Sequence, residues 1–282
     1  MIVRRSAAID ARRDAFLGLI GAKPVIMGVL NVTPDSFSDG GRFQALDSAL
    51  TQARKLTADG ADIIDVGAES TRPGAAPVPS QEEWRRLEPL LAPLLAEVEA
   101  PFSIDTYKAE IARRALALGV CVVNDVWGLQ KDSAMADVVA ESAAAVVIMH
   151  NREGIDPALD IEAELKRFFE RSLTLADRAG IKRTRILLDP GIGFGKTKAQ
   201  NLKALALTGA LRAAFDLPIL VGVSRKRLMS EPSGAAGVEE QLIGTVTANL
   251  AALARGAAVF RVHDPAAHAA AFKVWEAIER AG

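Results

Sequence analysis

Short apolar runs alternate with longer amphipathic stretches along most of this chain. The first run, Val25–Leu30, is rich in aliphatic residues and turns abruptly polar at Asn31. A run of this length, bounded by polar loop residues, is typical of a strand buried on both faces of a parallel sheet. The same pattern returns along the chain, and it predicts strands at residues 25–32, 62–67, 102–106, 120–125, 144–150, 185–190, 218–224 and 257–263.

Helical periodicity fills the segments between these runs. Leu46, Ala49, Leu50, Ala53 and Leu56 form one apolar stripe, as expected for a helix that packs on a sheet. Comparable patterns predict helices near residues 46–58, 108–118, 133–141, 161–179, 199–210, 238–255 and 265–280, and one more that begins at residue 80.

The helix after the second strand carries two local signals. Ser80 is followed three residues later by Glu83, which matches a capping box. Pro89 and Pro93 predict an irregular or short helix, because proline has no backbone N–H to donate.

Alternation of strands and helices without a composition break indicates one parallel α/β domain. Eight such units in a chain of 282 residues favour a closed TIM (β/α)8 barrel. A doubly wound open sheet is the alternative. We expect the barrel to span residues 24–282, with residues 1–23 as a lead-in segment that covers its bottom.

Composition narrows the function classes. The net charge is -1, so no global field points to nucleic acid or membrane, and any anion site must be local. The apolar runs are too short to span a bilayer, and the first residues lack a signal-peptide core, so we expect a cytoplasmic protein. Cys121 is the single cysteine and lies in an apolar run, which favours a buried structural thiol.

Polar side chains stand at the carboxyl end of each expected strand, which is where TIM barrels keep their active sites. They are Asn31, Asp65 with Glu69, Asp105, Asn124 with Asp125, His150, Asp189, Ser224–Lys226, and Arg261 with His263. Carboxylates and carboxamides on strands 3, 4 and 6 suit a flat heterocycle with several N–H donors. Cations gather after strands 7 and 8, a frequent phosphate site in this fold.

Several of these residues have a plain structural interpretation. His150 can be a core histidine, His268 is expected to be structural or exposed, and Arg225 and Arg227 can be surface arginines paired with helix acids. The segment Pro190–Thr197 nearly matches a P-loop, but Pro190 stands where the first glycine belongs. We therefore expect its glycines to serve a tight turn and close backbone approach to a ligand.

The motifs at the strand ends resemble bacterial dihydropteroate synthase over nearly the whole chain. The matching segments are MGVLNVTPDSFSDGG, IIDVGAESTRPGA, FSIDT, VVND, VVIMH, LLDPGIGFGK, LVGVSRK and FRVHD, in family order. The resemblance implies a transferase of folate biosynthesis that is usually a homodimer. It condenses 6-hydroxymethyl-7,8-dihydropterin pyrophosphate with p-aminobenzoate, uses Mg2+, and releases 7,8-dihydropteroate and pyrophosphate.

The resemblance also implies roles for single residues. Asn31 is similar to the family's metal and pyrophosphate ligand, and Asp189, Lys226, Arg261 and His263 join it as the implied catalytic set. The implied pterin-binding residues are Asp105, Asn124, Asp189 and Lys226. Those implied for pyrophosphate are Asn31, Thr71, Arg72, Arg261 and His263. Those implied for p-aminobenzoate, where sulfonamides compete, are Asp35, Thr71, Pro73, Phe194, Lys226 and Arg227.

The sequence departs from the family pattern at Tyr107, in the loop NREGIDPALD, and at Arg227. We expect Tyr107 on the outer rim, while Arg227 stands where many members have serine near the p-aminobenzoate carboxylate. Two other functions remain open: a non-catalytic pterin-binding barrel, and a methyltetrahydrofolate-binding methyltransferase domain. The second leaves the cations after strands 7 and 8 without a ligand.

Overall fold

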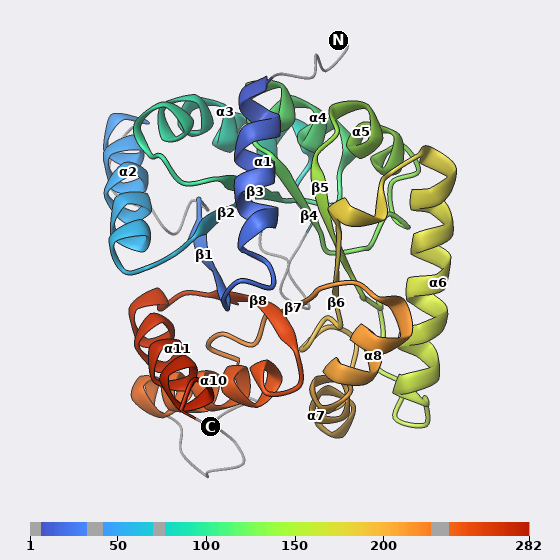
Figure 1. Cartoon of the computed structure of the whole chain (residues 1–282). Coiled ribbons are helices and arrows are strands. Elements are labelled where there is room, and N and C mark those ends of the chain that lie inside the picture. The colour runs from blue at the N-terminus through green and yellow to red at the C-terminus, as the bar shows by residue number, and fades with distance from the viewer. Residues whose placement is uncertain (1–6, 33–41, 70–76, 227–236, 282) are drawn as a thin grey trace.

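The computed structural model describes residues 7–32, 42–69, 77–226 and 237–281. Within these residues eight parallel strands form a closed barrel in sequential order, with β8 paired to β1 (Figure 1). The strands are β1 (Val25–Asn31), β2 (Ile63–Gly67), β3 (Phe102–Asp105), β4 (Val122–Asp125), β5 (Ala145–Met149), β6 (Ile186–Asp189), β7 (Ile219–Val221) and β8 (Ala257–Val262). The expected TIM barrel is therefore confirmed, since an open sheet would leave β1 and β8 apart.

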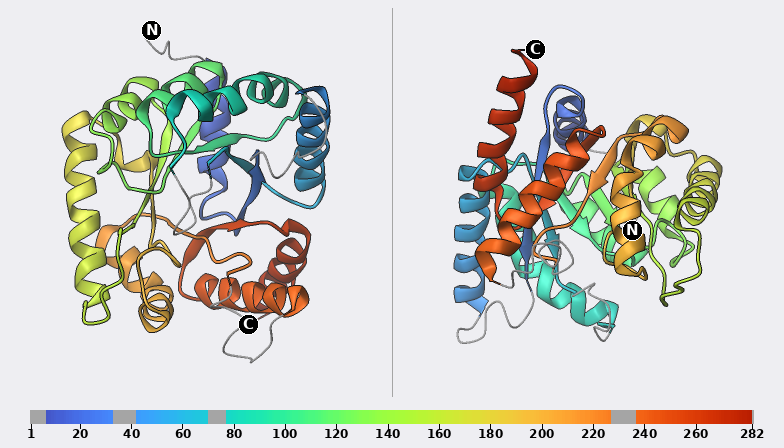
Figure 2. Two further views of the ribbon diagram at one scale, coloured as in Figure 1. Left: turned by 180° about the vertical axis from the view of Figure 1, so that it is seen from behind. Right: turned by 90° about the horizontal axis from the view of Figure 1, so that it is seen from below.

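Helices surround this barrel, as the view from behind in Figure 2 also shows. They are α1 (Ala7–Leu19), α2 (Arg42–Ala58), α3 (Ser80–Glu97), α4 (Ala109–Leu118), α5 (Met135–Ser142), α6 (Ile161–Ala179), the 3-10 turn η2 (Arg183–Arg185), α7 (Lys198–Ala206), α8 (Thr208–Phe215), α10 (Val238–Leu253) and α11 (Pro265–Glu279). Most boundaries lie within a few residues of those expected, and α6 has the expected bounds.

Helix α3 corrects both local expectations made for it. Ser80 lies inside the helix, the N-cap is Pro79, and no side chain caps the helix. Glu83 is fully buried and bonds Lys108 and Thr106 instead. Pro89 and Pro93 do not shorten the helix, which runs for 18 residues. Neither proline is buried, so the carbonyls they leave without a donor are close to solvent, while leucines on the other face pack in the core.

The segment after β6 holds two helices where one was expected. Helix α7 begins at a capping box in which Thr197 and Gln200 bond each other's backbone N–H groups. It ends at Ala206, and α8 follows after the single residue Leu207. Thr197 and Gln200 have the spacing that was sought at Ser80, so here the sequence signal was present and overlooked.

The barrel interior is filled by alternate residues of the strands. Met27, Ile63, Val122, Leu187 and Val259 belong to one buried apolar cluster. Helix α1 contributes to the same cluster, with Ile9 and Phe16 buried against it. In Figure 1 this helix crosses in front of the strands. Burial of each large apolar side chain contributes about 1.5–3 kcal/mol, so the packing of Ile9 and Phe16 against the strand residues stabilises the barrel.

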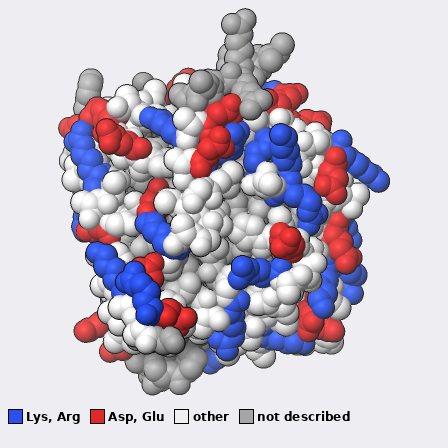
Figure 3. All heavy atoms as spheres, in the orientation of Figure 1, with Lys and Arg blue, Asp and Glu red and all other residues white. Residues whose placement is uncertain are grey.

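The outer surface mixes both signs of charge. On the face shown in Figure 3, Lys and Arg alternate with Asp and Glu without a large patch of one sign. Among the described helices, none is both long enough and apolar enough to cross a membrane.

Candidate active site

Interior side chains at the carboxyl ends of the strands form the candidate site. In the register of the sheet, Asp105 pairs with Asn124 on the neighbouring strand, and Asp65 pairs with Ser103. Strand residues alternate between the two faces of a sheet, so these residues share the interior parity of Met27 and Ile63. Four polar side chains from the neighbouring strands β2, β3 and β4 thus face the interior of the barrel mouth.

Arg261 on β8 joins these carboxylates. Its Nε donates to Asp65 Oδ2 at 2.6 Å, and its NH2 group donates to Asp105 Oδ2 at 2.7 Å. Burial alone would lower the pKa of Arg261, but attraction to the two carboxylates outweighs it and raises that pKa above its ordinary value. The guanidinium is therefore permanently charged and held inside the mouth.

Asp105 keeps one oxygen for a ligand. Its Oδ1 is buried and has no hydrogen-bond partner among the described residues. Burial raises the pKa of Asp105 to about 7, although the charge of Arg261 opposes this shift. The carboxyl can therefore hold or release a proton near neutral pH, and Oδ1 would meet an N–H donor of a flat heterocycle.

Asp189 lies at the same end of the barrel as Arg261. A Cβ atom on Gly222 would stand 3.8 Å from Asp189 Oδ2 and 3.9 Å from Arg261 Cβ, so both side chains flank one glycine. Asp189 Oδ1 accepts the N–H of Gly191 at 2.7 Å. Burial raises the pKa of Asp189, and that hydrogen bond opposes the shift.

Lys226 borders the same space from the segment after β7. Its Nζ donates to the carbonyl of Ile192 and lies 4.7 Å from the centre of the Phe194 ring. Burial lowers the pKa of Lys226 to about 8, and the charge of Asp189 opposes that shift. Lys226 thus contacts the loop that carries Phe194 and is attracted by the carboxylate of Asp189.

Asn31 and His263 line a neighbouring cavity of about 320 Å3, together with Ser48, Gln52 and Arg225. The ring of His263 is oriented by Ser224, whose Oγ lies 2.9 Å from Nδ1 and accepts the backbone N–H of His263 at 3.0 Å.

Arg225 makes two hydrogen bonds to Asp264, at 3.0 and 2.6 Å. The interpretation of Arg225 as a surface arginine paired with an acid therefore agrees with the structure.

Other expected site residues lie outside the described part of the chain. They are Asp35, Thr71, Arg72, Pro73 and Arg227. Of the remaining residues, the structure brings Asp105, Asn124, Asp189, Lys226 and Arg261 to one mouth, with Phe194 beside Lys226. Arg261 is bonded to the carboxylates of Asp65 and Asp105.

Cys121 is fully buried, as expected, and His150 is also fully buried, which agrees with the core-histidine alternative. Burial raises the pKa of the Cys121 thiol to about 11, so it is a poor nucleophile. His268 is also buried, and its ring bonds Asn249 at 2.9 Å, which makes it structural.

Asp65 was found at a strand end but was not counted as a site residue. It is fully buried and accepts hydrogen bonds from Ser103, from Asn124 at 3.0 Å and from Arg261. The carboxylate therefore orients two of the expected ligand-binding side chains. Its interior parity with Ile63 was the signal that could have identified it.

A second group of residues that the sequence did not reveal forms hydrogen bonds just after the end of β2. Lys108 Nζ bonds Glu69 at 2.5 Å, Glu83 at 2.6 Å and the carbonyl of Val78 at 2.5 Å. Tyr107, expected at the outer rim, is partly exposed and donates to Glu69 at 3.3 Å. The spacing of these residues in the sequence gave no sign of this contact.

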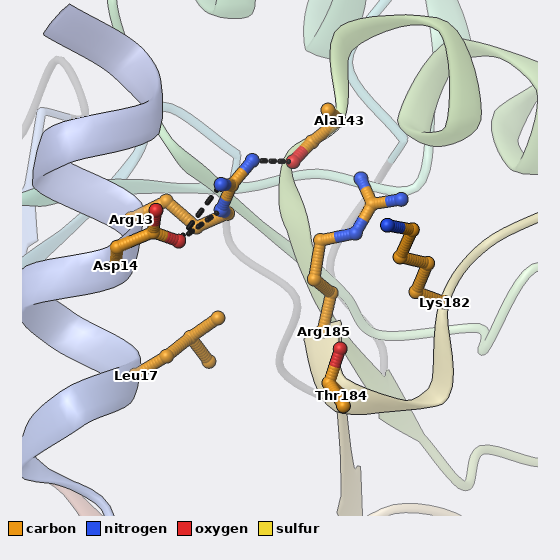
Figure 4. A pocket seen from close by; sticks show the side chains of 7 residues that line it. All are labelled: Arg13, Asp14, Leu17, Ala143, Lys182, Thr184 and Arg185. Atoms are coloured by element: carbon orange, nitrogen blue, oxygen red, sulfur yellow. Dashed lines mark hydrogen bonds and ion pairs between the residues drawn. The ribbon is translucent and has the colours of Figure 1, made fainter. Parts of the chain in front are cut away.

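Another cavity, of about 340 Å3, lies at the opposite end of the barrel, beside the segments that lead into β5 and β6 (Figure 4). Arg13 of α1 faces it but is engaged by Asp10, Asp14 and the carbonyl of Ala143. The cavity holds none of the residues expected to bind substrate. We therefore place the active site at the carboxyl ends of the strands.

The closed barrel, the carboxylates that line its mouth and the adjacent cations are the features expected of a TIM-barrel enzyme that binds a flat heterocycle carrying an anionic group. Residues 27–263 match the family described as pterin binding enzyme. The chain is 40% identical to a dihydropteroate synthase of Clostridium beijerinckii, over 93% of this chain and 96% of that protein. The chain belongs to the dihydropteroate synthase family of pterin-binding enzymes.

Solved structures agree with this assignment. A Clostridium difficile dihydropteroate synthase, determined in the presence of pteroic acid, superposes with a TM-score of 0.87 and 45% identity, covering 92% of this chain and 98% of that one. The Xanthomonas albilineans dihydropteroate synthase with 4-aminobenzoic acid gives 0.86 and 42%, covering 91% and 93%.

Proposed function

We propose that this protein condenses 6-hydroxymethyl-7,8-dihydropterin pyrophosphate with p-aminobenzoate to give 7,8-dihydropteroate and pyrophosphate. The observation that carries the proposal is the placement of Asp189 and Arg261 on either side of Gly222, with Asn124 and Asp105 in the same mouth. A single small molecule can reach all of these groups.

The pterin ring binds to Asp105, Asn124, Asp189 and Lys226. Buried carboxylates accept the N–H groups of the ring, while Asn124 and Lys226 donate to its acceptors. When the bond between the methylene carbon and oxygen breaks, the electron pair leaves with pyrophosphate and the ring shares the positive charge. The Asp189 carboxylate stabilises that cation, which is an interaction stronger in the transition state than in the substrate.

Asn31 and His263 bind the pyrophosphate from their shared cavity, and Arg261 contributes its fixed charge beside them. The donor set also fits Mg2+, which takes one or two protein oxygens, phosphate oxygens and waters. Among the described residues no three His, Cys, Asp or Glu side chains form a metal cage, so Asn31 would hold the ion together with the substrate. When bound, the ion offsets negative charge on the leaving group.

The p-aminobenzoate ring lies against Phe194 and Lys226. Its amine attacks the methylene carbon, a carbon–nitrogen bond forms, and the amine then releases a proton to solvent. An aryl amine is a sufficient nucleophile near neutral pH, so the reaction needs no strong general base. Asp35, Thr71, Arg72, Pro73 and Arg227 complete the two substrate sites, as the family resemblance implies.

We further propose that the protein acts as a cytoplasmic homodimer. Four of the most exposed large apolar side chains of the described residues lie on α10 and α11, which pack against each other: Val238 (78% exposed), Ile243 (60%), Val274 (62%) and Ile278 (63%). Apolar side chains gathered on neighbouring helices are typical of a surface covered by a second copy. The single buried thiol suits a reducing compartment.

Release of pyrophosphate tests the function. Purified protein with Mg2+ and both substrates should release pyrophosphate and form dihydropteroate in equal amounts, and omission of p-aminobenzoate should prevent dihydropteroate formation. A folded protein that binds the pterin and releases no pyrophosphate would instead be the non-catalytic binding barrel. Sedimentation tests the dimer, and a monomer at assay concentration would contradict it.

A further inference from the structure

The lysine of the near-P-loop segment Pro190–Thr197 is buried and bonded to its own loop and to His150. Lys196 is 5% exposed, and its Nζ lies 2.7 Å from His150 Nδ1, 2.7 Å from the carbonyl of Gly191 and 3.0 Å from the carbonyl of Phe194. An ammonium group has three N–H donors, and here each has one acceptor. The side chain therefore closes the loop from inside.

The backbone of this loop lies very close to the segment after β5. Gly191 has a φ of +63°, and a Cβ there would stand 1.8 Å from the carbonyl oxygen of His150. Gly195 has a φ of +58°, and a Cβ there would stand 2.6 Å from Arg152. Glycine is required at both positions, and Lys196 bonds across the same contact.

The loop held in this way carries three features of the candidate site. The N–H of Gly191 donates to Asp189, the carbonyl of Ile192 accepts from Lys226, and the Phe194 ring lies beside Lys226. Phe194 is one of the residues expected to bind p-aminobenzoate, and Ile192 contacts Lys226, which is another. Lys196 contacts the carbonyl of Phe194 directly, so its loss acts first on that side of the site.

We propose that Lys196 is a positioning residue that holds the loop 191–196 against His150 and thereby shapes the p-aminobenzoate pocket. The inference rests on the proposed function for its choice of substrate. Lys196 itself touches neither substrate, and it acts through Phe194 and through the Lys226–Ile192 contact.

Burial leaves the proton of Lys196 weakly held. Together with the charges of Lys226 and Arg152 it lowers the pKa of Lys196 to about 7, while the charges of Asp189 and Glu164 oppose the shift. His150 stays neutral, because burial and the charge of Lys196 lower its pKa to about 2.

Two protonation states preserve all three contacts. The ammonium form donates to Nδ1 of His150, whose proton is then on Nε2. The neutral amine has two N–H groups for the carbonyls and one lone pair, which requires the proton of His150 to be on Nδ1. Loss of one proton from Lys196 is therefore coupled to a change of tautomer in His150.

Lys196→Met tests the positioning role, with Lys203→Met as the matched control. Lys203 is on α7, its side chain is 52% exposed, and its ion pair with Asp160 is 3.5 Å long. In Lys196→Met the KM for p-aminobenzoate should rise by about tenfold or more, as expected for loss of a charge-assisted contact. The KM for the pterin pyrophosphate should change by less than about threefold. The control should match the unchanged protein.

Equal rises in both KM values, or no difference between the two variants, would overturn the proposal. The tautomer of His150 provides a test that needs neither turnover nor a folded variant. With 15N-labelled histidine, NMR of the unchanged protein should show the proton of His150 on Nε2 at pH 5.5 and on Nδ1 at pH 8.5. One tautomer at both pH values would overturn the coupling of Lys196 and His150. If this test succeeds while the protein releases no pyrophosphate, the proposed function fails and the contact stands.

Discussion

Arg261 Nε donates to Asp65 Oδ2 at 2.6 Å across 196 residues of sequence, inside a barrel mouth where Asp65 is fully buried. One guanidinium thus faces this carboxylate and that of Asp105, whose pKa burial already raises to about 7. The arrangement concentrates negative charge inside the mouth, and the guanidinium of Arg261 offsets that charge.

Arg261→Ala should therefore reduce stability in a pH-dependent way. Without the cation the pKa of Asp105 in the folded state rises further above the ordinary 3.8 of an aspartate. A carboxyl with a raised pKa destabilises the fold as pH increases from its unfolded value toward its folded value. We expect a loss of about 3–5 kcal/mol at pH 8, as for the removal of one partner of a buried ion pair, and a smaller loss near pH 4.

Urea unfolding at several pH values measures this effect. The control is Arg225→Ala, which removes a half-exposed arginine and its pair with Asp264 and should cost at most about 1 kcal/mol. A loss in Arg261→Ala that does not vary between pH 4 and pH 8 would contradict the explanation.

Asp189→Asn should preserve the fold and reduce turnover. The amide oxygen can still accept the N–H of Gly191, but the variant has no charge to stabilise a cation on the pterin methylene. We expect kcat to fall by about 10²–10³, the range for loss of one electrostatic contact in a transition state. Steady-state kinetics with a thermal melt of the same sample checks this. The exposed Asp137→Asn on α5 is the control, and unchanged turnover in Asp189→Asn would remove the assignment.

Lys226 should produce an alkaline limit on activity. Burial lowers its pKa to about 8, and in the proposed function the charged form of Lys226 donates to the pterin. The ratio kcat/KM for the pterin pyrophosphate should therefore fall as pH rises through about 8. A pH profile from 6 to 10 measures the limit, and a profile that stays flat through pH 9 is inconsistent with this role.

Gly191→Ala should be strongly destabilising. Its φ of +63° disfavours any side chain, and the new Cβ would meet the carbonyl of His150 at 1.8 Å. A residue forced into this region costs about 1–3 kcal/mol before the collision is counted. Gly154→Ala is the control, since nothing lies within 4 Å of a Cβ there. Similar melting temperatures for the two variants would show that the loop can shift freely.

The sequence predicted the barrel well because each strand is a compact apolar run whose end is marked by a polar residue. Its errors came where tertiary contacts override a local signal. Glu83 matches a capping box by spacing, but it is drawn into the core by Lys108 and Thr106. Pro89 and Pro93 are tolerated because the buried leucines of α3 hold the helix in place.

The site was predictable to the extent that it depends on strand ends. Asp105, Asn124 and Asp189 were named from their positions alone, and the barrel brings them to one mouth. Asp65 could have been identified from its interior parity with Ile63, but its contact with Arg261 and the contact of Lys196 with His150 were not predictable, because the partners are 196 and 46 residues away in sequence. Such contacts leave no local pattern, and the near-match of the letters around Lys196 to a P-loop, which was not favoured, gave no sign of them.

A crystal structure with the pterin pyrophosphate ester and Mg2+ tests the central claim most directly. We expect the ring between Asp189 and Asn124, and the pyrophosphate of the same molecule beside Asn31, His263 and Arg261. A ring bound away from Asp189, or a ligand in the cavity at the amino ends of the strands (Figure 4), would contradict it.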